Sequence, residues 1–318
     1  MSTLFSHFFT KINQISPQEH NFTEVLSTIA LKPKTLYFYG KLPQNVSKTV
    51  AIVGSRHNTR YGKEVAYNLA YKLAQKGVII VSGLAYGIDS IGHRGCLDAG
   101  GVTVAVLGNP IDRIHPANHT ELAAEIIKNG GAVISEYPPS TSDDTYFAPG
   151  EFTNEFGKRQ VEYKTSFLYR NRLISGLSDI VVVVEAAEKS GSLNTATHAL
   201  EQGKTVFAVP GNITNPYSQG CNKLIKQGAL PYTEPDDILR ELFPADYVKK
   251  QKKLHQAKLF GDTDVETKIL QAVASGLRSG EDLMRTTHLP PEVFNQAVTL
   301  LEIKGRLRPL GLNNWGLV

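Results

Sequence analysis

Small and polar residues stand directly after several apolar runs of the chain, where they are placed to bind an anion. The segment Gly54-Ser55-Arg56 follows the run 50–53, and Gly83 and Gly87 follow the run 78–81. Three further residues of this kind are Ser135, Gly191 and Ser192. Unpaired N–H groups at helix starts bind anions, and the guanidinium fork of an arginine matches a phosphate. One such turn would be an ordinary tight connection, but several at one sheet edge, with an arginine, favour an anion site.

A dense run of cations and aromatic residues lies at 164–172, and we expect it at the start of a helix over 173–177. Its chemically informative members are Lys164, Phe167, Arg170, Asn171 and Arg172. Cations follow a sugar-phosphate backbone and aromatic rings stack on exposed bases, which is how single strands are held. Arginines beside a helix N-terminus also oppose its dipole and favour an anionic partner. The run predicts a single-strand-binding surface; the alternative is a solvated helix start with Phe167 in the core.

Nucleotide-cofactor and metal sites find little support. The dinucleotide fingerprint G-x-G-x-x-G is absent, because the glycine that follows Gly54 is Gly62. The triplet 203–205 matches the end of a P-loop but lacks the required upstream glycine. His115 and His119 have a possible metal-ligand spacing, yet no third ligand is near in sequence. We therefore expect neither a cofactor nor a metal.

The titratable residues indicate internal pairs rather than catalysis. Asp89 and His93 are four residues apart on one expected helix, so their side chains can pair. Glu136 and Glu185 stand at strand ends, and we expect them to pair with Arg170 or Arg172 rather than act as an acid and a base. We assign no catalytic residue and expect no enzymatic activity.

The composition is that of an ordinary globular protein. The chain has 318 residues and a mass of 34.9 kDa, of which 41% are hydrophobic and 20% charged. Cys96 and Cys221 are the two cysteines, too few for a disulfide scaffold or a cysteine-rich zinc site. The formal net charge of +4 suits a polyanionic partner without requiring one. The sequence predicts no membrane span and no signal peptide, and hence a cytoplasmic location.

The anion-binding turns need a sheet to hold them, and the alternation of elements between residues 49 and 228 predicts one. Short β-branched runs alternate there with longer amphipathic segments, which is typical of parallel strands covered on both faces. The fold class is therefore α/β with a doubly wound, mostly parallel sheet. The run 36–39 would add an edge strand. The expected strands lie at 50–53, 78–81, 103–107, 132–134, 180–184 and 205–209.

Four parts follow from these patterns: a stub with a short helical arm and an edge strand (1–48), the α/β domain (49–241), a basic linker (242–260) and a small domain (261–318). In the small domain we expect helices over 265–274 and 280–287 and a third opened by Pro290 and Pro291. The third helix would bury Val293, Ala297, Leu300 and Leu301. A hairpin over 305–318 completes a winged-helix domain.

An ordered set of motifs resembles the DNA-processing protein A family, also called DprA or Smf, over about residues 33 to 240. Turn motifs of the set are Gly54-Ser55-Arg56, Ser82-Gly83, Gly87-Ile88-Asp89 and Gly108. Others are 116–118, 135–139, Arg170-Asn171-Arg172 with 173–177, Ser190-Gly191-Ser192-Leu193, 209–211 and 220–229. The C-terminal winged helix is similar to the one that many members carry.

The resemblance implies an extended Rossmann-like fold that binds single-stranded DNA. It also implies a homodimer that protects incoming DNA and loads the RecA recombinase during natural transformation. The residues that match the family's DNA pocket are Gly54, Ser55, Arg56, Ser135, Lys164, Phe167, Arg170, Asn171, Arg172, Gly191 and Ser192. Gly83 and Gly87 join the predicted site on the strand-end argument alone.

The chain departs from the family pattern in places. Leu168 and Gly92 replace a usual proline and alanine, and an insertion at about 146–163 precedes Phe167. A second hypothesis is a Rossmann-like enzyme that hydrolyses nucleoside monophosphates. The segment 190–195 lacks the acidic residue that such enzymes carry after their glycine-rich run. A dinucleotide oxidoreductase fails for want of the fingerprint.

Overall fold

The computed structural model describes residues 9, 11–44, 47–140, 163–245 and 260–317, with the backbone alone at 151–153, 159–161, 163 and 164. The chain divides into two compact units, residues 1–242 and 243–318. Within the described residues, no helix combines the length and the apolar character that crossing a bilayer requires.

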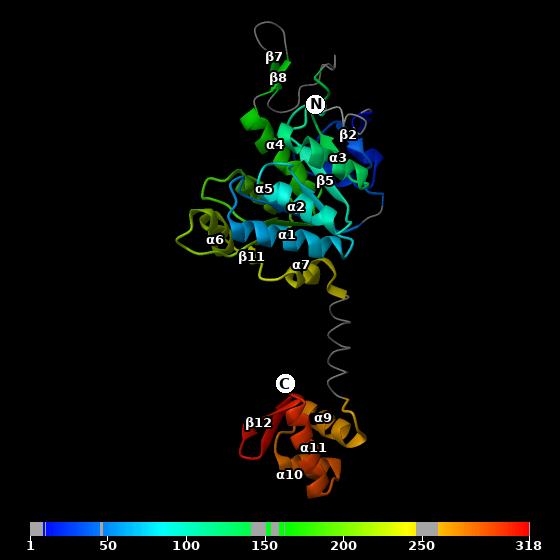
Figure 1. The fold of residues 1–318 in the computed structure, drawn as a ribbon, viewed down its shortest axis with the longest axis vertical. Helices are drawn as coiled ribbons and strands as arrows, with labels where there is room; N and C mark the ends of the chain where they lie inside the picture. The colour runs from blue at the N-terminus through cyan, green and yellow to red at the C-terminus, as the bar shows by residue number, and fades with distance from the viewer. Residues whose placement is uncertain are drawn as a thin grey trace. The chain divides into compact units, whose positions relative to one another are not determined.

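The first unit is built on a nine-stranded sheet with the strand order β1-β2-β6-β5-β4-β3-β9-β10-β11 (Figure 1). The strands from β6 to β11 in this order are parallel, whereas β1 and β2 are antiparallel additions. Their bounds are β1 Asn13–Ile15, β2 Leu36–Gly40, β3 Thr49–Val53, β4 Ile79–Ser82, β5 Thr103–Leu107, β6 Ala132–Ser135, β9 Ile180–Val183, β10 Thr205–Ala208 and β11 Leu230–Pro231.

Helices cover both faces of this sheet. One face carries α1 (Arg60–Ala74), α2 (Ile88–Asp98) and α3 (Thr120–Lys128). The other carries α4 (Tyr163–Gly176), α5 (Gly191–Glu201) and α6 (Gln219–Lys226). The short α7 (Pro235–Leu242) packs on α1. Short 3₁₀ turns among the described residues connect these elements: η2 (Pro17–Glu19), η3 (Glu24–Ser27), η4 (Ala117–His119) and η5 (Pro216–Ser218).

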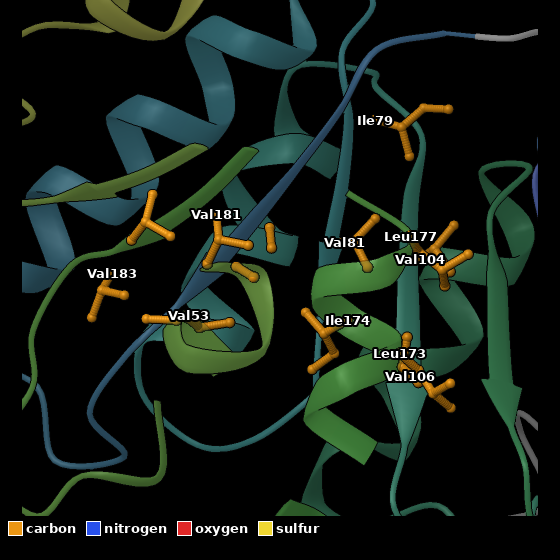
Figure 2. Close-up of a cluster of buried hydrophobic side chains, with 14 of the residues drawn as sticks. Val53, Ile79, Val81, Val104, Val106, Leu173, Ile174, Leu177, Val181 and Val183 are labelled. Atoms are coloured by element: carbon orange, nitrogen blue, oxygen red, sulfur yellow. The ribbon is translucent and has the colours of Figure 1, made fainter. Parts of the chain in front are cut away.

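The core follows from the period of two along each strand. Val104 and Val106 of β5 face α4, where Leu173 and Leu177 pack against them (Figure 2). The alternate residues of the same strand lie in the cluster under α3. Because both faces are covered, the strands are apolar throughout, and this is the pattern that the sequence shows. The α/β class with a doubly wound, mostly parallel sheet is confirmed.

The order of the strands reverses beside β3. The chain runs from β3 outwards through β4, β5 and β6, then returns to place β9 on the other side of β3. Ligands of open α/β sheets bind at such a switch point, at the carboxyl ends of the strands. A ligand site is therefore expected at the carboxyl ends of β3 and β9.

The N-terminal segment differs from the expectation. The run 36–39 is a strand, but β1 pairs outside it, so β2 is not at the edge. Of the expected helical arm, the described residues 17–27 form the 3₁₀ turns η2 and η3. Leu26 and Ile29 from this segment enter the core beside α4. A contact between distant segments, which local periodicity does not encode, decides this arrangement.

The predicted insertion at 146–163 is described only in part. The backbone of β7 (Glu151–Thr153) and β8 (Arg159–Val161) forms a two-stranded antiparallel ribbon. The rest of the insertion up to residue 162, and the basic run 249–253 of the predicted linker, lie outside the described residues.

The second unit has the three helices and hairpin of a winged helix. They are α9 (Asp264–Ala274), α10 (Gly280–Thr287), α11 (Pro291–Ile303), β12 (Leu307–Gly311) and β13 (Asn314–Leu317). The buried face of α11 is Phe294, Ala297, Val298 and Leu301. The expected face was wrong at Val293 and Leu300, which are 37% and 41% exposed. Phe294 packs edge-on against Trp315 of the hairpin and so fixes the rotation of the helix.

Candidate functional site

A cavity of about 750 Å³ opens at the switch point between β3 and β9. Three segments form most of its wall: the turn after β3 at 54–57, one face of α4, and the segment 187–192 that leads into α5. The cavity brings together Gly54, Ser55, Arg56, Phe167, Arg170, Asn171, Gly191 and Ser192 of the predicted site. These residues come from three separated stretches, and the parallel sheet gathers them because its carboxyl ends meet at one edge.

The start of α4 corrects the expectation for the run 164–172. The predicted helix began at residue 173, but α4 begins at Tyr163, so the run is helical throughout. Residues three and four apart share a helix face. Phe167, Arg170 and Asn171 therefore all line the cavity. The helix-dipole argument for an anionic partner fails, since neither arginine lies in the first turn.

Phe167 stands among cations and is half-buried. The centroid of its ring lies 5.6 Å from Cζ of Arg56 and 5.8 Å from Cζ of Arg170. The imidazole of His115 lies 5.3 Å from the ring, centroid to centroid, and is tilted by 31°. Cation–π attraction over these distances holds the exposed Arg56 guanidinium beside the ring.

Arg170 is a buried part of the cavity wall, 5% exposed. Its Nη1 donates to the carbonyl oxygen of Gly83 at 2.9 Å and to that of Val106, and its Nε donates to Asn171 Oδ1 at 3.3 Å. A Cβ at Gly83 would lie 2.7 Å from the guanidinium, so only glycine permits this approach. Burial lowers the pKa of Arg170 to about 10, although the charge of Asp89 acts in the opposite direction. Gly83 is thus a support of the site.

Asp89 and His93 do not pair with each other, contrary to expectation. The carboxylate of Asp89 accepts from the backbone N–H of Gly83 at 3.1 Å. Burial raises the pKa of this carboxyl, and the charge of Arg170 opposes the rise. His93 Nδ1 instead lies 2.7 Å from Thr103 Oγ1. Both residues are buried: Asp89 holds the turn after β4, and His93 contacts the first residue of β5.

The start of α5 presents open backbone to the cavity. Ser190 caps the helix, its hydroxyl lying 2.7 Å from that of Ser192 and accepting from the Ser192 N–H at 3.4 Å. Among the described residues, a Cβ at Gly191 would meet only Leu168, at 3.9 Å, so this part of the structure leaves the first turn uncovered. Asn171 Nδ2 donates to the Gly191 carbonyl oxygen at 3.2 Å and fixes α5 against α4.

Backbone hydrogen bonds to two neighbouring segments hold the turn after β3. The N–H of Ser55 donates to the carbonyl oxygen of Glu185 at 2.7 Å, and its own carbonyl accepts from Ile88 at 3.2 Å. Gly87 has a φ of +76°, and a Cβ there would lie 2.3 Å from the Ser55 carbonyl oxygen. Gly87 therefore shapes the turn and does not line the cavity. Arg56 is left exposed at the rim.

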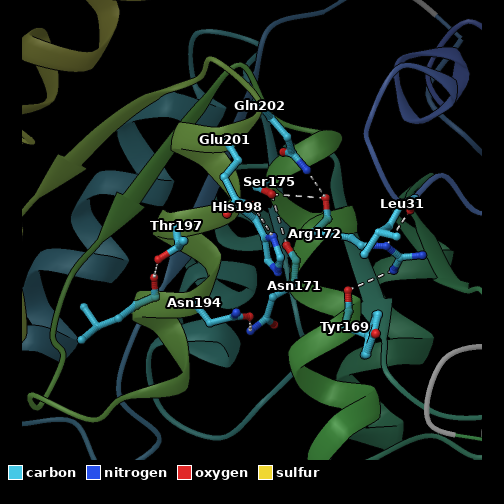
Figure 3. Close-up of polar contacts among 11 residues, drawn as sticks. Leu31, Tyr169, Asn171, Arg172, Ser175, Asn194, Thr197, His198, Glu201 and Gln202 are labelled. Carbon is cyan, nitrogen blue, oxygen red and sulfur yellow. Dashed lines mark hydrogen bonds and ion pairs between the residues drawn. The ribbon is translucent and has the colours of Figure 1, made fainter.

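Arg172 and Ser135 lie away from the cavity, and Lys164 is described by its backbone alone. Asn171 and Arg172 leave α4 on opposite sides (Figure 3). Arg172 Nη2 donates to both carboxylate oxygens of Glu136, at 2.9 and 2.8 Å, and Nε donates to the Leu31 carbonyl oxygen at 2.7 Å. Ser135 is fully buried and donates to the Asn109 carbonyl oxygen at 2.6 Å.

Of the two expected carboxylate–arginine pairs, one is confirmed. Glu136 pairs with Arg172, as predicted. Glu185 does not pair with any arginine among the described residues; its Oε2 accepts from the Thr59 N–H at 2.8 Å and its Oε1 from the Thr59 hydroxyl. This carboxylate is buried under the start of α1 and anchors the helix. It is not placed as an acid or a base in the cavity.

Sequence reasoning missed His57, Lys189 and Tyr217, which also line the cavity. Lys189 and His57 are exposed and add positive charge to the rim. Their positions beside Ser190 and Arg56 were a usable signal. Tyr217 arrives from η5, and nothing near it in the sequence indicated a site.

The two histidines with metal-like spacing have other contacts. His115 lies on Phe167, and His119 Nδ1 is 2.8 Å from the Leu84 carbonyl oxygen. Among the described residues, no three histidine, cysteine or acidic side chains are grouped as metal ligands would be.

Comparison with known proteins places this geometry in a family. A family model for the DNA recombination-mediator protein A matches residues 13–243, and one for the DprA winged helix domain matches residues 255–311. Protein Smf of Escherichia coli is 45% identical over 210 residues, which are 66% of this chain and 51% of that protein. The matched segment thus spans about half of the Escherichia coli relative.

A second relative and a solved structure also match the chain. The DNA processing protein DprA of Bacillus subtilis is 38% identical over 232 residues, 73% of this chain and 71% of that protein. The structure of DNA processing protein A from Helicobacter pylori, described for its single-stranded-DNA binding mode, superposes with a TM-score of 0.57 at 30% identity. It covers 75% of this chain and 98% of that one.

Proposed function

Because the chain belongs to the DNA recombination-mediator protein A family, we propose that it binds single-stranded DNA in the cavity at the switch point. The proposal includes delivery of the strand to the RecA recombinase in natural transformation, with no reaction catalysed. It also includes a cytoplasmic location and a homodimer. Light scattering tests the homodimer: a particle of twice 34.9 kDa supports it, and a monomer at all concentrations contradicts it.

The observation that carries the proposal is the convergence of exposed cations around a half-buried aromatic ring. Arg56, His57 and Lys189 are exposed and line the same cavity as Phe167 and the start of α5, and the Arg56 guanidinium lies beside the Phe167 ring. Cations attract phosphates, and an aromatic side chain offers a stacking surface that any base can use. The residues proposed to touch DNA are Gly54, Ser55, Arg56, His57, Lys164, Phe167, Arg170, Asn171, Lys189, Gly191 and Ser192. We propose supporting roles for Gly83, Gly87, Ser135 and Arg172.

The titration that tests the proposal compares single-stranded and blunt duplex oligonucleotides in gel-shift assays at several salt concentrations. We expect tighter binding of the single strand. Its log affinity should fall linearly with log salt, with a slope of about −0.7 for each phosphate neutralised. Equal affinity for duplex and single strand at moderate salt would contradict the proposal. Turnover of AMP or NADH by the same preparation would instead support an enzyme.

Replacing Arg56 by alanine should weaken binding by about 1–3 kcal/mol, or roughly 5- to 150-fold, because a charge-assisted phosphate contact is lost. The loss should be alike for all sequences, since phosphate contacts do not read bases. Lys76→Ala is the matched control, because it removes one exposed charge just before β4, at the amino edge of the sheet. If both variants bind like the parent protein, Arg56 is not in the site.

Delivery to RecA is tested by the lag before RecA assembles on a strand coated with single-strand-binding protein. The protein should shorten this lag, and Arg56→Ala should shorten it less in proportion to its weaker binding. An unchanged lag, measured where strand binding is saturated, would leave a DNA-binding protein that does not load RecA.

A further inference from the structure

We propose that the cavity at the switch point also binds a free nucleoside 5′-monophosphate, which competes with the DNA strand. The inference rests on the proposed function only in that both ligands would use the same phosphate-binding groups. The cavity volume of about 750 Å³ lies within the range of small-molecule sites, roughly 300–1,000 Å³. A strand that merely crosses a charged surface needs no such hollow.

The phosphate end of this site is the start of α5. Gly191 leaves the first turn of an 11-residue helix uncovered, and the partial positive charge of that terminus faces the cavity. Lys189 and Arg56 line the same cavity and are exposed, so both can close on a phosphate group.

A second, independent feature points to an anion. Arg170 is 5% exposed and lines the cavity, and its Nη1 and Nε are used by internal acceptors. Its Nη2 makes no hydrogen bond to any described residue and is not fully buried, so it is open to the cavity. Asp89 offsets part of the charge without a hydrogen bond to it. A ligand oxygen in the cavity would accept a hydrogen bond from this Nη2.

The base and ribose would meet the apolar part of the wall. Phe167 and Tyr217 are half-buried there, with Ile174 and Ala187 between α4 and the segment that leads into α5. Apolar and aromatic walls with a few converging polar groups are what bind and orient small ligands. A monophosphate fits this division, because it has one anionic end and one aromatic end.

The test uses the full-length protein and AMP as the probe. Isothermal titration calorimetry should show binding with a dissociation constant of about 10 μM to 1 mM. AMP should also displace a labelled oligothymidylate, measured by anisotropy at constant ionic strength. Adenosine and inorganic phosphate should each bind at least about tenfold more weakly, because each occupies only one end of the site.

Variants locate the ligand. Arg56→Ala and Phe167→Ala should each raise the AMP dissociation constant by about fivefold or more, whereas Lys76→Ala should leave it unchanged. Absence of heat up to about 5 mM AMP, or equal binding of AMP and phosphate, would overturn the inference. The oligonucleotide titration without AMP reports separately on the proposed function, so the two failures are distinguishable.

Discussion

Replacing Arg172 by alanine should lower the free energy of unfolding by about 3–5 kcal/mol, measured by urea denaturation. The side chains of Arg172 and Glu136 are 3% and 2% exposed and form an ion pair at 2.8 Å. Removing the guanidinium leaves a buried carboxylate with no compensating charge, and it frees the carbonyl oxygens of Leu31 and Tyr169. The expected loss is a large part of the stability of an ordinary domain.

Two further variants serve as controls for this measurement. Arg94→Ala breaks the pair with Glu125 on the surface, where the side chains are 43% and 33% exposed, and should cost less than about 1 kcal/mol. The double variant Arg172→Met with Glu136→Leu removes both charges and should recover much of the loss. If Arg172→Ala keeps the parent stability but loses strand binding, Arg172 is a DNA contact and its supporting role is wrong.

Acidification from about pH 6.5 to pH 4.5 should remove roughly 2–3 kcal/mol of stability through His93 alone. Burial, helped by the positive charges of His119 and Arg170, lowers the pKa of His93 to about 3. Between that value and the unfolded value of 6.5, the unfolded chain binds a proton that the folded chain does not. Stability therefore rises with pH across this window, is complete above it, and is lost as the pH falls.

The measurement is the pH dependence of unfolding free energy in the parent protein and in His93→Gln. The variant should have a shallower slope, whatever its absolute stability, because it has lost the titrating group. The raised pKa of Asp89 acts in the opposite direction above pH 3.8, and it acts in both proteins, so the difference in slopes isolates His93. Parallel slopes would mean that His93 is protonated in the folded state.

The sequence alone determined the six adjacent parallel strands from β6 to β10 and where several helices begin, but it did not indicate β1 or β11. The strand over 103–107 and the helix over 280–287 lie where the local pattern predicted them. Apolar runs and turn residues encode these elements, because hydrogen bonds within a helix and the burial of a strand on both faces depend on neighbouring residues. The same patterns predicted the doubly wound sheet and, through it, the edge where a site would form.

The local sequence pattern did not predict where α4 begins. Its cavity face carries Arg170 and Asn171 where an ordinary helix would carry apolar residues, so the period that marks a helix is broken. The helix therefore seemed to begin ten residues late, at 173 instead of Tyr163. With the true start, the spacing of Phe167, Arg170 and Asn171 places them on one face.

Only the tertiary structure decided which of these polar residues reach the cavity and which support the fold. Arg172 stands one residue beyond Asn171, yet it points to the other side of α4 and meets Glu136, 36 residues away in sequence. Lys189 and Tyr217 join the cavity from segments whose neighbourhood depends on the strand order. Such meetings are set by how helices pack on the sheet, and the free energy of that packing comes from contacts between distant residues, which a local pattern does not contain.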